Sequence, residues 1–281
     1  MRYYKMDHPL RGKALIFNQE KFLIGLPERT GTEFDRNRLA RILKQLKFEV
    51  IVYENHRHQR IRSLIEKVAL EDHDQCDCIL VCFMSHGDEY GNLFGSDGAI
   101  RFDELWTPFM DDCCPSLAGK PKIFIIQVEY WLSLCLFLKF MISCRGSKVN
   151  DGNNVMETRN YSQPDSTKEL GAHYNSSIPP DFLFVFSTTH GTNDIRQMLD
   201  FVFIEGYCSW RNPTEGSHFL QCLCDVLQQG SQDEDLLSLL EEVSKKIEKE
   251  SYYCHESDGQ LMKQMPDIKY NLTKKLKLHI H

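Results

Sequence analysis

Two residues of this chain have the types needed for nucleophilic catalysis. His86 follows one strongly apolar run of the sequence, and Cys144 lies beyond the next such run. A cysteine nucleophile needs a nearby imidazole to accept its proton, because the thiolate is the reactive form. Backbone N–H groups must then hold the oxyanion of a tetrahedral intermediate, and the glycines at 87 and 146 allow such amides to approach closely. The pair therefore predicts acyl-transfer chemistry.

The elements that would position these residues alternate along the chain. Short apolar runs, which a sheet covered on both faces requires, are separated by segments in which apolar residues follow the i, i+3, i+4, i+7 helical pattern. We therefore predict an α/β fold with a central, mostly parallel sheet flanked by helices on both faces, and ligands at the carboxyl ends of the strands. The predicted strands are 14–17, 48–53, 79–83, 123–126 and 182–186, and the predicted helices cover 39–46, 61–68, 219–227 and 236–247.

One segment interrupts this alternation. Residues 147–180 are rich in Gly, Asn, Ser, Pro and Asp and contain few apolar residues, which is typical of a long linker. The linker divides the chain into a large segment before it and a small segment after it.

Composition excludes several classes of function. The 281 residues carry a net charge of −7, which argues against nucleic acid or an acidic membrane as the main partner. The N-terminus lacks the apolar core of a signal peptide, and the 11 cysteines include no paired CxxC zinc ligands. We therefore expect a cytoplasmic protein in a reducing compartment, with no metal and no cofactor. The sequence also has no Gly-x-Ser-x-Gly, HExxH or P-loop motif.

The chain contains, in this order, the five stretches Arg11–Asn18, Arg29–Thr32, Met84–Asp88, Gly119–Gln127 and Ser209–Asn212. Together they make the chain resemble an executioner-type caspase from about residue 3 to about residue 279. The known signature of that family is Gln-Ala-Cys-[Arg/Gln/Gly]-Gly with a histidine roughly 50 residues upstream.

The resemblance implies roles for particular residues. It implies a cysteine endopeptidase that cleaves after aspartate, in which His86 is the general base and acid and Cys144 is the nucleophile. The backbone amides of Gly87 and Cys144 resemble the oxyanion hole. The residues implied to bind substrate are Arg29, Gln127, Ser209, Trp210, Arg211 and Asn212.

The physical chemistry of arginine agrees with the implied specificity. Two guanidinium groups can bracket one carboxylate with charge-assisted, bidentate hydrogen bonds, which a longer Glu or a neutral Asn cannot satisfy equally. A substrate that left such buried arginines unpaired would be rejected, because an unpaired buried charge is costly. We therefore expect Arg29 and Arg211 to grip the substrate aspartate.

The sequence departs from the family in three places. Sixteen residues, 128–143, separate Gln127 from Cys144 where the family has one residue, and a second excess of about 15 residues spans 192–206. Both inserts interrupt otherwise continuous motifs, so we hypothesise that they are retained introns translated in frame. In addition, His218 stands where the family usually has Trp.

These departures leave two hypotheses open. The first is an active aspartate-specific protease acting in programmed cell death. The second is a catalytically impaired, caspase-like regulator that binds caspase subunits or substrates. Retention of His86, Cys144, Arg29 and Arg211 favours the first hypothesis, and the two inserts favour the second.

The resemblance also implies a zymogen that is cut after an aspartate in the linker. Asp165 is the best candidate because it lies in a polar stretch and precedes a small residue, Ser166; Asp151 is the runner-up, and we expect Asp181 to be shielded at the start of a strand. Cleavage there would give a large subunit, 1–165, and a small subunit, 166–281. We expect pairs of these subunits to dimerise, and we expect activating caspases and inhibitor proteins as partners. Because the catalytic domain begins almost at Met1, we expect no recruitment domain before it.

Overall fold

All five predicted strands are present in the computed structural model, which describes residues 2–88, 91–130, 173–175, 177–188, 211–231, 233–250 and 264–278. The main sheet has the order β2-β1-β3-β6-β8-β11-β7. Strands β2, β1, β3, β6 and β8 are parallel to one another, and β11 pairs antiparallel with β8. These strands are β1 (Lys13–Asn18), β2 (Glu49–Glu54), β3 (Ile79–Gly87), β6 (Lys122–Tyr130), β7 (His173–Tyr174), β8 (Phe182–Phe186) and β11 (Asp267–Tyr270).

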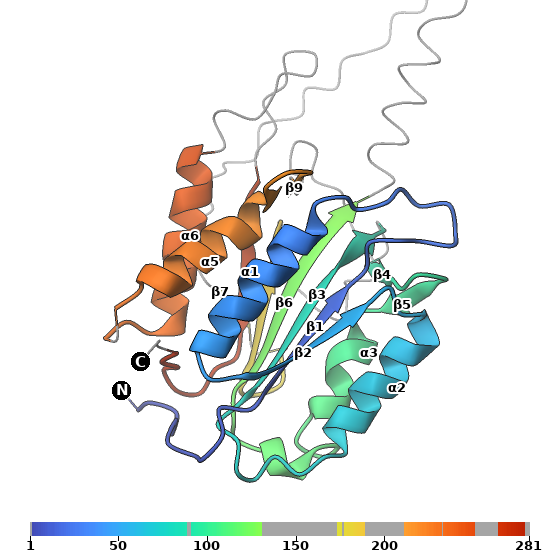
Figure 1. Cartoon of the computed structure of the whole chain (residues 1–281). Helices are drawn as coiled ribbons and strands as arrows, with labels where there is room; N and C mark the ends of the chain where they lie inside the picture. Colours follow the sequence, from blue (N-terminus) through green and yellow to red (C-terminus); the bar gives the residue numbers. More distant parts are fainter. Residues whose placement is uncertain are drawn as a thin grey trace, which may run out of the picture.

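Helices cover both faces of the sheet, as predicted (Figure 1). One face carries α1 (Thr32–Gln45), α5 (His218–Gln229) and α6 (Leu236–Glu250), and the other carries α2 (His58–Ala69) and α3 (Asp103–Trp106). Two short 3-10 helices span Thr107–Phe109 and Pro115–Leu117. A β4–β5 hairpin (Asn92–Phe94, Ala99–Arg101) extends from the end of β3, and a separate β9–β10 hairpin (Arg211–Asn212, Gly216–Ser217) precedes α5.

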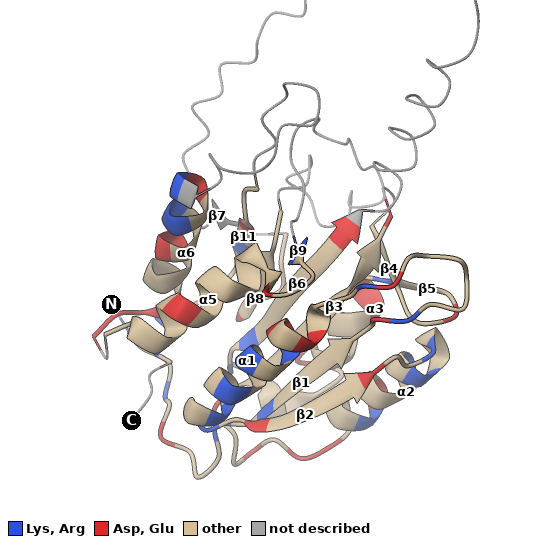
Figure 2. Cartoon of the chain, turned by 45° about the horizontal axis from the view of Figure 1, so that its top comes forward, with Lys and Arg blue, Asp and Glu red and all other residues tan. Residues whose placement is uncertain are grey.

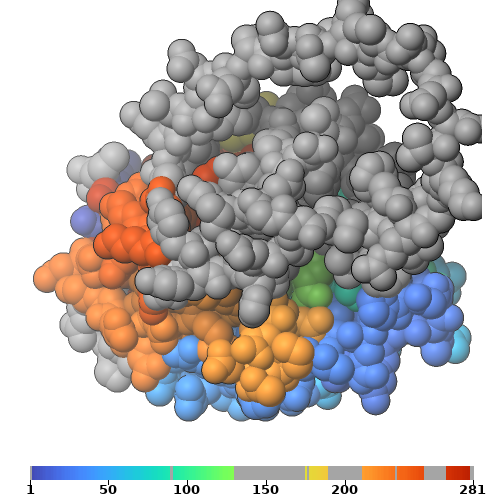
Figure 3. Space-filling view, turned by 90° about the horizontal axis from the view of Figure 1, so that it is seen from above, coloured from blue at the N-terminus to red at the C-terminus, as the bar shows by residue number. Residues whose placement is uncertain are grey.

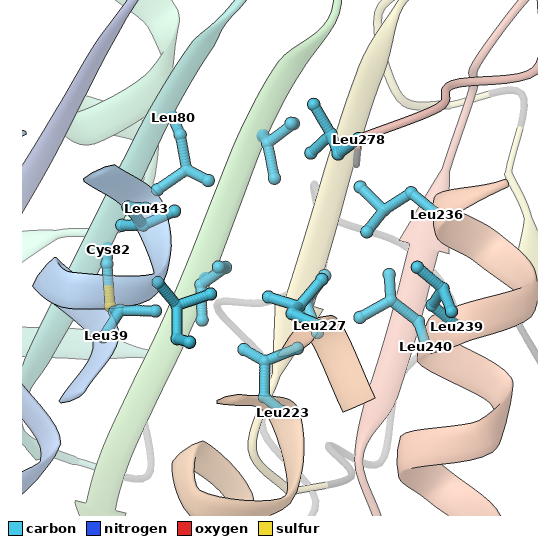
Figure 4. Close-up of a cluster of buried hydrophobic side chains, with 14 of the residues drawn as sticks. Leu39, Leu43, Leu80, Cys82, Leu223, Leu227, Leu236, Leu239, Leu240 and Leu278 are labelled. Atoms are coloured by element: carbon cyan, nitrogen blue, oxygen red, sulfur yellow. The ribbon is translucent and has the colours of Figure 1, made fainter. Parts of the chain in front are cut away.

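The sheet divides the apolar core into two layers, because successive side chains of a strand point to opposite faces. In β3, Leu80 and Cys82 pack under α1, α5 and α6, whereas Val81 and Phe83 pack under α2 and α3. Figure 4 shows the first layer, in which Leu39 and Leu43 of α1 lie beside Leu80 and Cys82 of β3, and leucines of α5 and α6 cover strands farther along the sheet. Both layers are fully buried at β3, which explains why its sequence is a continuous apolar run.

Some element boundaries differ from the sequence-based expectations. His86 and Gly87 are the last two residues of strand β3, not part of the loop after it, because β3 pairs with β6 as far as Tyr130. The predicted linker ends too late: His173 and Tyr174 form β7, which pairs with β11. The first insert is continuous with β6, since Val128 and Glu129 extend that strand.

Asp181 is shielded at the start of β8, as expected. Its side chain is buried and its carboxylate accepts a 2.6 Å hydrogen bond from the Tyr4 hydroxyl. Its N–H group donates to the Asn271 carbonyl. Within the described ranges, no helix has the length and apolar character needed to cross a membrane.

Candidate active site

The side chain of His86 is fixed in one orientation at the end of β3. Nε2 donates a hydrogen bond to the carbonyl oxygen of Pro27 at 2.9 Å, so Nδ1 is the basic nitrogen of the neutral ring. The ring of Phe22 packs against it, with the two ring centroids 4.9 Å apart. Both Pro27 and Phe22 belong to the loop between β1 and α1.

The environment of His86 favours the neutral imidazole. Burial lowers the pKa of His86 below its ordinary value, and the positive charge of Arg29 adds to this effect, although the Pro27 carbonyl and the charge of Glu129 oppose it. A histidine that is neutral near pH 7 can accept a proton, which is the property a general base needs.

Strand pairing places residue 129 directly opposite His86. In the parallel ladder between β3 and β6, Met84 is the register partner of Gln127 and His86 is the register partner of Glu129. Side chains two residues apart in a strand share a face, so Gln127 and Glu129 project from the same face of β6. Gln127 is fully buried. Nδ1 of His86 lies 3.4 Å from the carbonyl oxygen of Glu129.

Arg29 is held by the loop that precedes α1. The residue is fully buried, and Nη1 donates to the carbonyl of Gln19 at 2.9 Å and to the hydroxyl of Thr32 at 3.3 Å. Gly31 makes this loop possible. It has a φ of 85°, and a Cβ atom at this position would lie 2.6 Å from the carbonyl oxygen of Pro213. The motif Arg29–Thr32 therefore needs glycine so that the loop can approach the β9–β10 hairpin.

Arg211 reaches the same place from the β9–β10 hairpin. Its Nη1 donates to the carbonyl of Thr30, which joins the hairpin to the Arg29 loop. Seen from above, the orange 211–217 hairpin lies against the blue N-terminal segment (Figure 3). Asp35 of α1 holds the other end of the hairpin, because its carboxylate accepts hydrogen bonds of 2.9 and 2.8 Å from the N–H of Ser217.

The two arginines converge on a single carboxylate, that of Glu129. Nη2 of Arg29 lies 3.0 Å from Oε1, and Arg211 binds bidentately, with Nε 2.8 Å from Oε1 and Nη2 2.9 Å from Oε2. Figure 2 shows the acidic end of β6 and the short basic strand β9 at the same end of the sheet. Burial alone would raise the pKa of Glu129, but the charges of Arg29 and Arg211 lower it overall. The arrangement is a buried carboxylate-binding site.

The structure brings together only part of the predicted site. His86, Gly87, Arg29, Gln127 and Arg211 lie around the carboxyl ends of β3 and β6. Asn212 is exposed on β9, where its side-chain oxygen accepts a 2.9 Å hydrogen bond from the N–H of Thr214. His218 is the first residue of α5 and is half-buried. The remaining predicted site residues, Cys144, Ser209, Trp210 and Asp165, lie outside the described residues, as does the insert 192–206.

Five of the described cysteines are poor candidates for a nucleophile. Burial raises the thiol pKa of several of them, to about 12 for Cys224, whereas a reactive thiol needs a lowered pKa. Cys113 is exposed, but its pKa is also raised. The other cysteines with a raised pKa are Cys76, Cys78 and Cys82.

Sequence reasoning missed three residues of this site. Pro27 acts through its backbone carbonyl, which leaves no signal in the side-chain pattern. Asp35 lies in the first turn of α1, where an acidic residue ordinarily indicates only a favourable helix start. Glu129 lies two residues after Gln127, and that spacing in an apolar strand is the signal that it shares a face with the predicted pocket.

Comparison with known proteins agrees with this geometry. Residues 11–277 match the family described as the caspase domain. The chain belongs to the caspase family. It is 36% identical over 278 residues to Caspase-1 of Spodoptera frugiperda, covering 98% of this chain and 80% of that one. It is 35% identical to Caspase drICE of Drosophila melanogaster over 98% of this chain and 71% of that one.

Solved caspase structures also have this fold. The crystal structure of Caspase-1 from Spodoptera frugiperda superposes with a TM-score of 0.72 at 34% identity, covering 100% of this chain and 96% of that one. The structure of pro-sf-caspase-1 gives a TM-score of 0.69 at 34% identity, covering 99% and 98%. The expected caspase-like α/β fold is therefore confirmed.

Membership of the family establishes the class of reaction. This caspase is a cysteine endopeptidase that acts on protein chains with an aspartate before the scissile bond. The match to a pro-caspase structure supports a zymogen form, and dimeric assembly follows from the family.

Proposed function

We propose that this caspase cleaves after aspartate with Cys144 as the nucleophile and His86 as its general base and acid. Nδ1 of His86 faces the end of β6, and its Nε2–H is held by the Pro27 carbonyl, so Nδ1 can accept the thiol proton and later return it to the leaving amine. The backbone amides of Gly87 and Cys144 would stabilise the oxyanion.

The observation that carries the proposed specificity is the convergence of Arg29 and Arg211 on one carboxylate. Their guanidinium groups approach the same oxygen, Oε1 of Glu129, at 3.0 and 2.8 Å. A substrate aspartate placed there would receive the same charge-assisted hydrogen bonds. In this proposal Gln127, Ser209, Trp210 and Asn212 complete the substrate site around the two arginines.

The test is hydrolysis of a fluorogenic tetrapeptide that ends in Asp. We expect cleavage by the processed chain and none by its Cys144→Ala variant, while the Asn counterpart of the peptide is left intact. Cleavage that persists in Cys144→Ala would refute the assignment of the nucleophile.

A second candidate function is a catalytically impaired regulator that binds caspase subunits or substrates. It is favoured by Glu129, because this residue occupies the position opposite His86 and holds both arginines. The two candidates differ in a simple observation: the regulator would bind an aspartyl peptide or a caspase partner without turnover.

The family assignment supports a proposal for the biological setting. We propose a cytoplasmic effector of programmed cell death, made as a zymogen that is cut after Asp165 into subunits 1–165 and 166–281. Two such pairs would assemble as a dimer. Activating caspases would supply the cut, and inhibitor proteins would bind the substrate site.

A further inference from the structure

We call the site between Arg29 and Arg211, which is proposed to bind the substrate aspartate, the aspartate site. In this structure it already contains a carboxylate, that of Glu129. Glu129 extends from β6 into the space between two guanidinium groups, and its side chain is 18% exposed. Arg29 contacts Oε1 through Nε at 3.3 Å and Nη2 at 3.0 Å, and Arg211 contacts both oxygens. Both arginines are therefore satisfied by one internal acid.

The two arginines are positioned by groups other than Glu129. The carbonyl of Gln19 and the hydroxyl of Thr32 hold Nη1 of Arg29, and the carbonyl of Thr30 holds Nη1 of Arg211. The site is thus built by the β1–α1 loop and the β9–β10 hairpin, and Glu129 enters it from a third element. Glu129 therefore binds to this site as a ligand binds to a preformed pocket.

The end of β6 is suited to reversible withdrawal. The register pairs between β6 and β8 stop at Ile126 and Phe186, so within the described residues the last four positions of β6 pair in register with β3 alone. A strand end that is paired on one side can separate at a lower cost than the strand centre. The two like charges of Arg29 and Arg211 favour any carboxylate placed between them, so the carboxylate of a substrate can replace that of Glu129 when the strand end withdraws.

We propose that Glu129 is an internal ligand of the aspartate site, so that the site accepts the carboxylate of a substrate aspartate only when the end of β6 withdraws. This inference rests on the proposed role of Arg29 and Arg211 in binding that aspartate. The unmodified chain is then a closed form, whose apparent affinity for an aspartyl peptide is reduced by the small fraction of open molecules.

The first experiment measures binding, so that it does not depend on Cys144. A fluorescein-labelled tetrapeptide amide with a C-terminal Asp is titrated against the full chain and its Glu129→Ala variant by fluorescence anisotropy. We expect Glu129→Ala to bind the peptide at least about 10-fold more tightly. The matched control is Glu28→Gln, which removes the charge of an exposed acid beside Arg29 and should leave the affinity unchanged. Equal affinities of the unmodified and Glu129→Ala chains would overturn the proposal.

The second experiment fills the vacated position with a small carboxylate. Propionate carries the same carboxylate as the Glu129 side chain, and propionamide has nearly the same shape without the charge. We expect propionate, but not propionamide, to raise the thermal midpoint of Glu129→Ala, and neither to affect the unmodified chain. An equal response to both compounds would show that the two arginines do not form a carboxylate site there.

A further variant, Glu129→Asp, tests the proposal even if Glu129→Ala folds poorly. Glu129→Asp keeps the charge but is shorter by one methylene, so it reaches the two arginines less well and should give an intermediate peptide affinity. An affinity equal to that of the unmodified chain would contradict the proposal. Adding Arg211→Ala to either Glu129 variant should abolish the gain in affinity.

The results separate this inference from the proposed proteolysis. Tighter binding by Glu129→Ala without any cleavage supports the internal ligand and refutes the activity of this chain. Conversely, cleavage of the Asp peptide by the unmodified chain, at a rate that Glu129→Ala does not change, supports proteolysis and overturns the internal ligand.

Discussion

His86 and Glu129 are register partners in the parallel ladder between β3 and β6. Nδ1 of His86 lies 3.4 Å from the backbone carbonyl oxygen of Glu129. In the family signature, the second residue after the glutamine is the cysteine nucleophile. Here the second residue after Gln127 is Glu129, and Cys144 follows 15 positions later. The insert thus changes which residue stands opposite His86, while the ring of His86 is still held by Pro27 and Phe22.

The nucleophile assignment is tested by replacing each of two cysteines with alanine. Cys144→Ala should abolish aspartate-directed cleavage and leave the fold intact, because the substitution is small. Cys135→Ala, within the first insert, should leave cleavage nearly unchanged. An irreversible aspartyl electrophile followed by peptide mapping identifies the labelled residue, and labelling of Cys135 would show that the alignment of the insert is wrong.

The two arginines should differ in their effect on stability but not on specificity. Arg29→Ala and Arg211→Ala should each lower kcat/KM for an Asp peptide by at least about 100-fold, because each substitution removes charge-assisted hydrogen bonds to the substrate carboxylate. Arg29 is fully buried whereas the side chain of Arg211 is 11% exposed, so Arg29→Ala should cost more unfolding free energy. Chemical denaturation and peptide kinetics, in the unmodified chain and in Glu129→Ala, check both statements. Equal rates on Asp and Asn peptides would exclude the pocket.

The burial of His86 predicts the pH dependence of cleavage. Because burial lowers the pKa of His86, the acidic limb of the kcat/KM profile should lie below the ordinary imidazole value of about 6.5. Phe22→Ala uncovers the ring and should move this limb toward higher pH. Rate profiles of the two proteins make the comparison, and a limb that stays in place would mean that Phe22 does not shield the histidine.

Asp35 should make stability fall as the pH rises. Burial raises the pKa of Asp35 to about 6, although hydrogen bonds from Ser217 oppose this shift. The folded state therefore binds the proton more tightly than the unfolded state, in which the pKa is about 3.9. The stabilisation is fully present below about pH 4 and is lost as the pH rises through 6.

Urea denaturation of the unmodified chain and of Asp35→Asn measures this effect. Relative to Asp35→Asn, the unmodified chain should lose roughly 2–3 kcal/mol of unfolding free energy between about pH 4 and pH 7. Parallel stability curves would show that Asp35 keeps an ordinary pKa.

The sequence predicts a strand best where both faces of that strand are buried. Phe182–Phe186 is apolar throughout because helices cover both faces of β8, and its limits were predicted correctly. By contrast, β7 has two residues, His173 and Tyr174, which is too short for any periodic signal, so the sequence pattern alone places them in the linker. Strand β3 was predicted too short because its last residues, including His86, are polar.

The candidate site was predictable where side chains carry the function. Arg29 and Arg211 are 182 positions apart in the sequence, and the resemblance to caspases brought them to one pocket, where the structure also places them. The occupant of that pocket was harder to predict, because the two-residue spacing from Gln127 places Glu129 on the same face only if the strand continues to residue 129. The register between β3 and β6 shows that β6 does continue past residue 129 and that Glu129 lies opposite His86.

Zymogen processing should occur after Asp165, in the polar stretch between the large and small segments. Ser166 follows it, and a small residue after the scissile bond suits a protease cleft. Asp181 should resist, because its side chain is 4% exposed and its N–H is bonded to Asn271. The two fragments should remain associated, since β6 of the first pairs with β8 of the second. Mass spectrometry after incubation with an active caspase should find a new Ser166 N-terminus, and an Asp165→Ala variant is the control. Fully processed protein with an intact Asp165–Ser166 bond would refute the assignment, and a cut after Asp151 instead would move the subunit boundary to that residue.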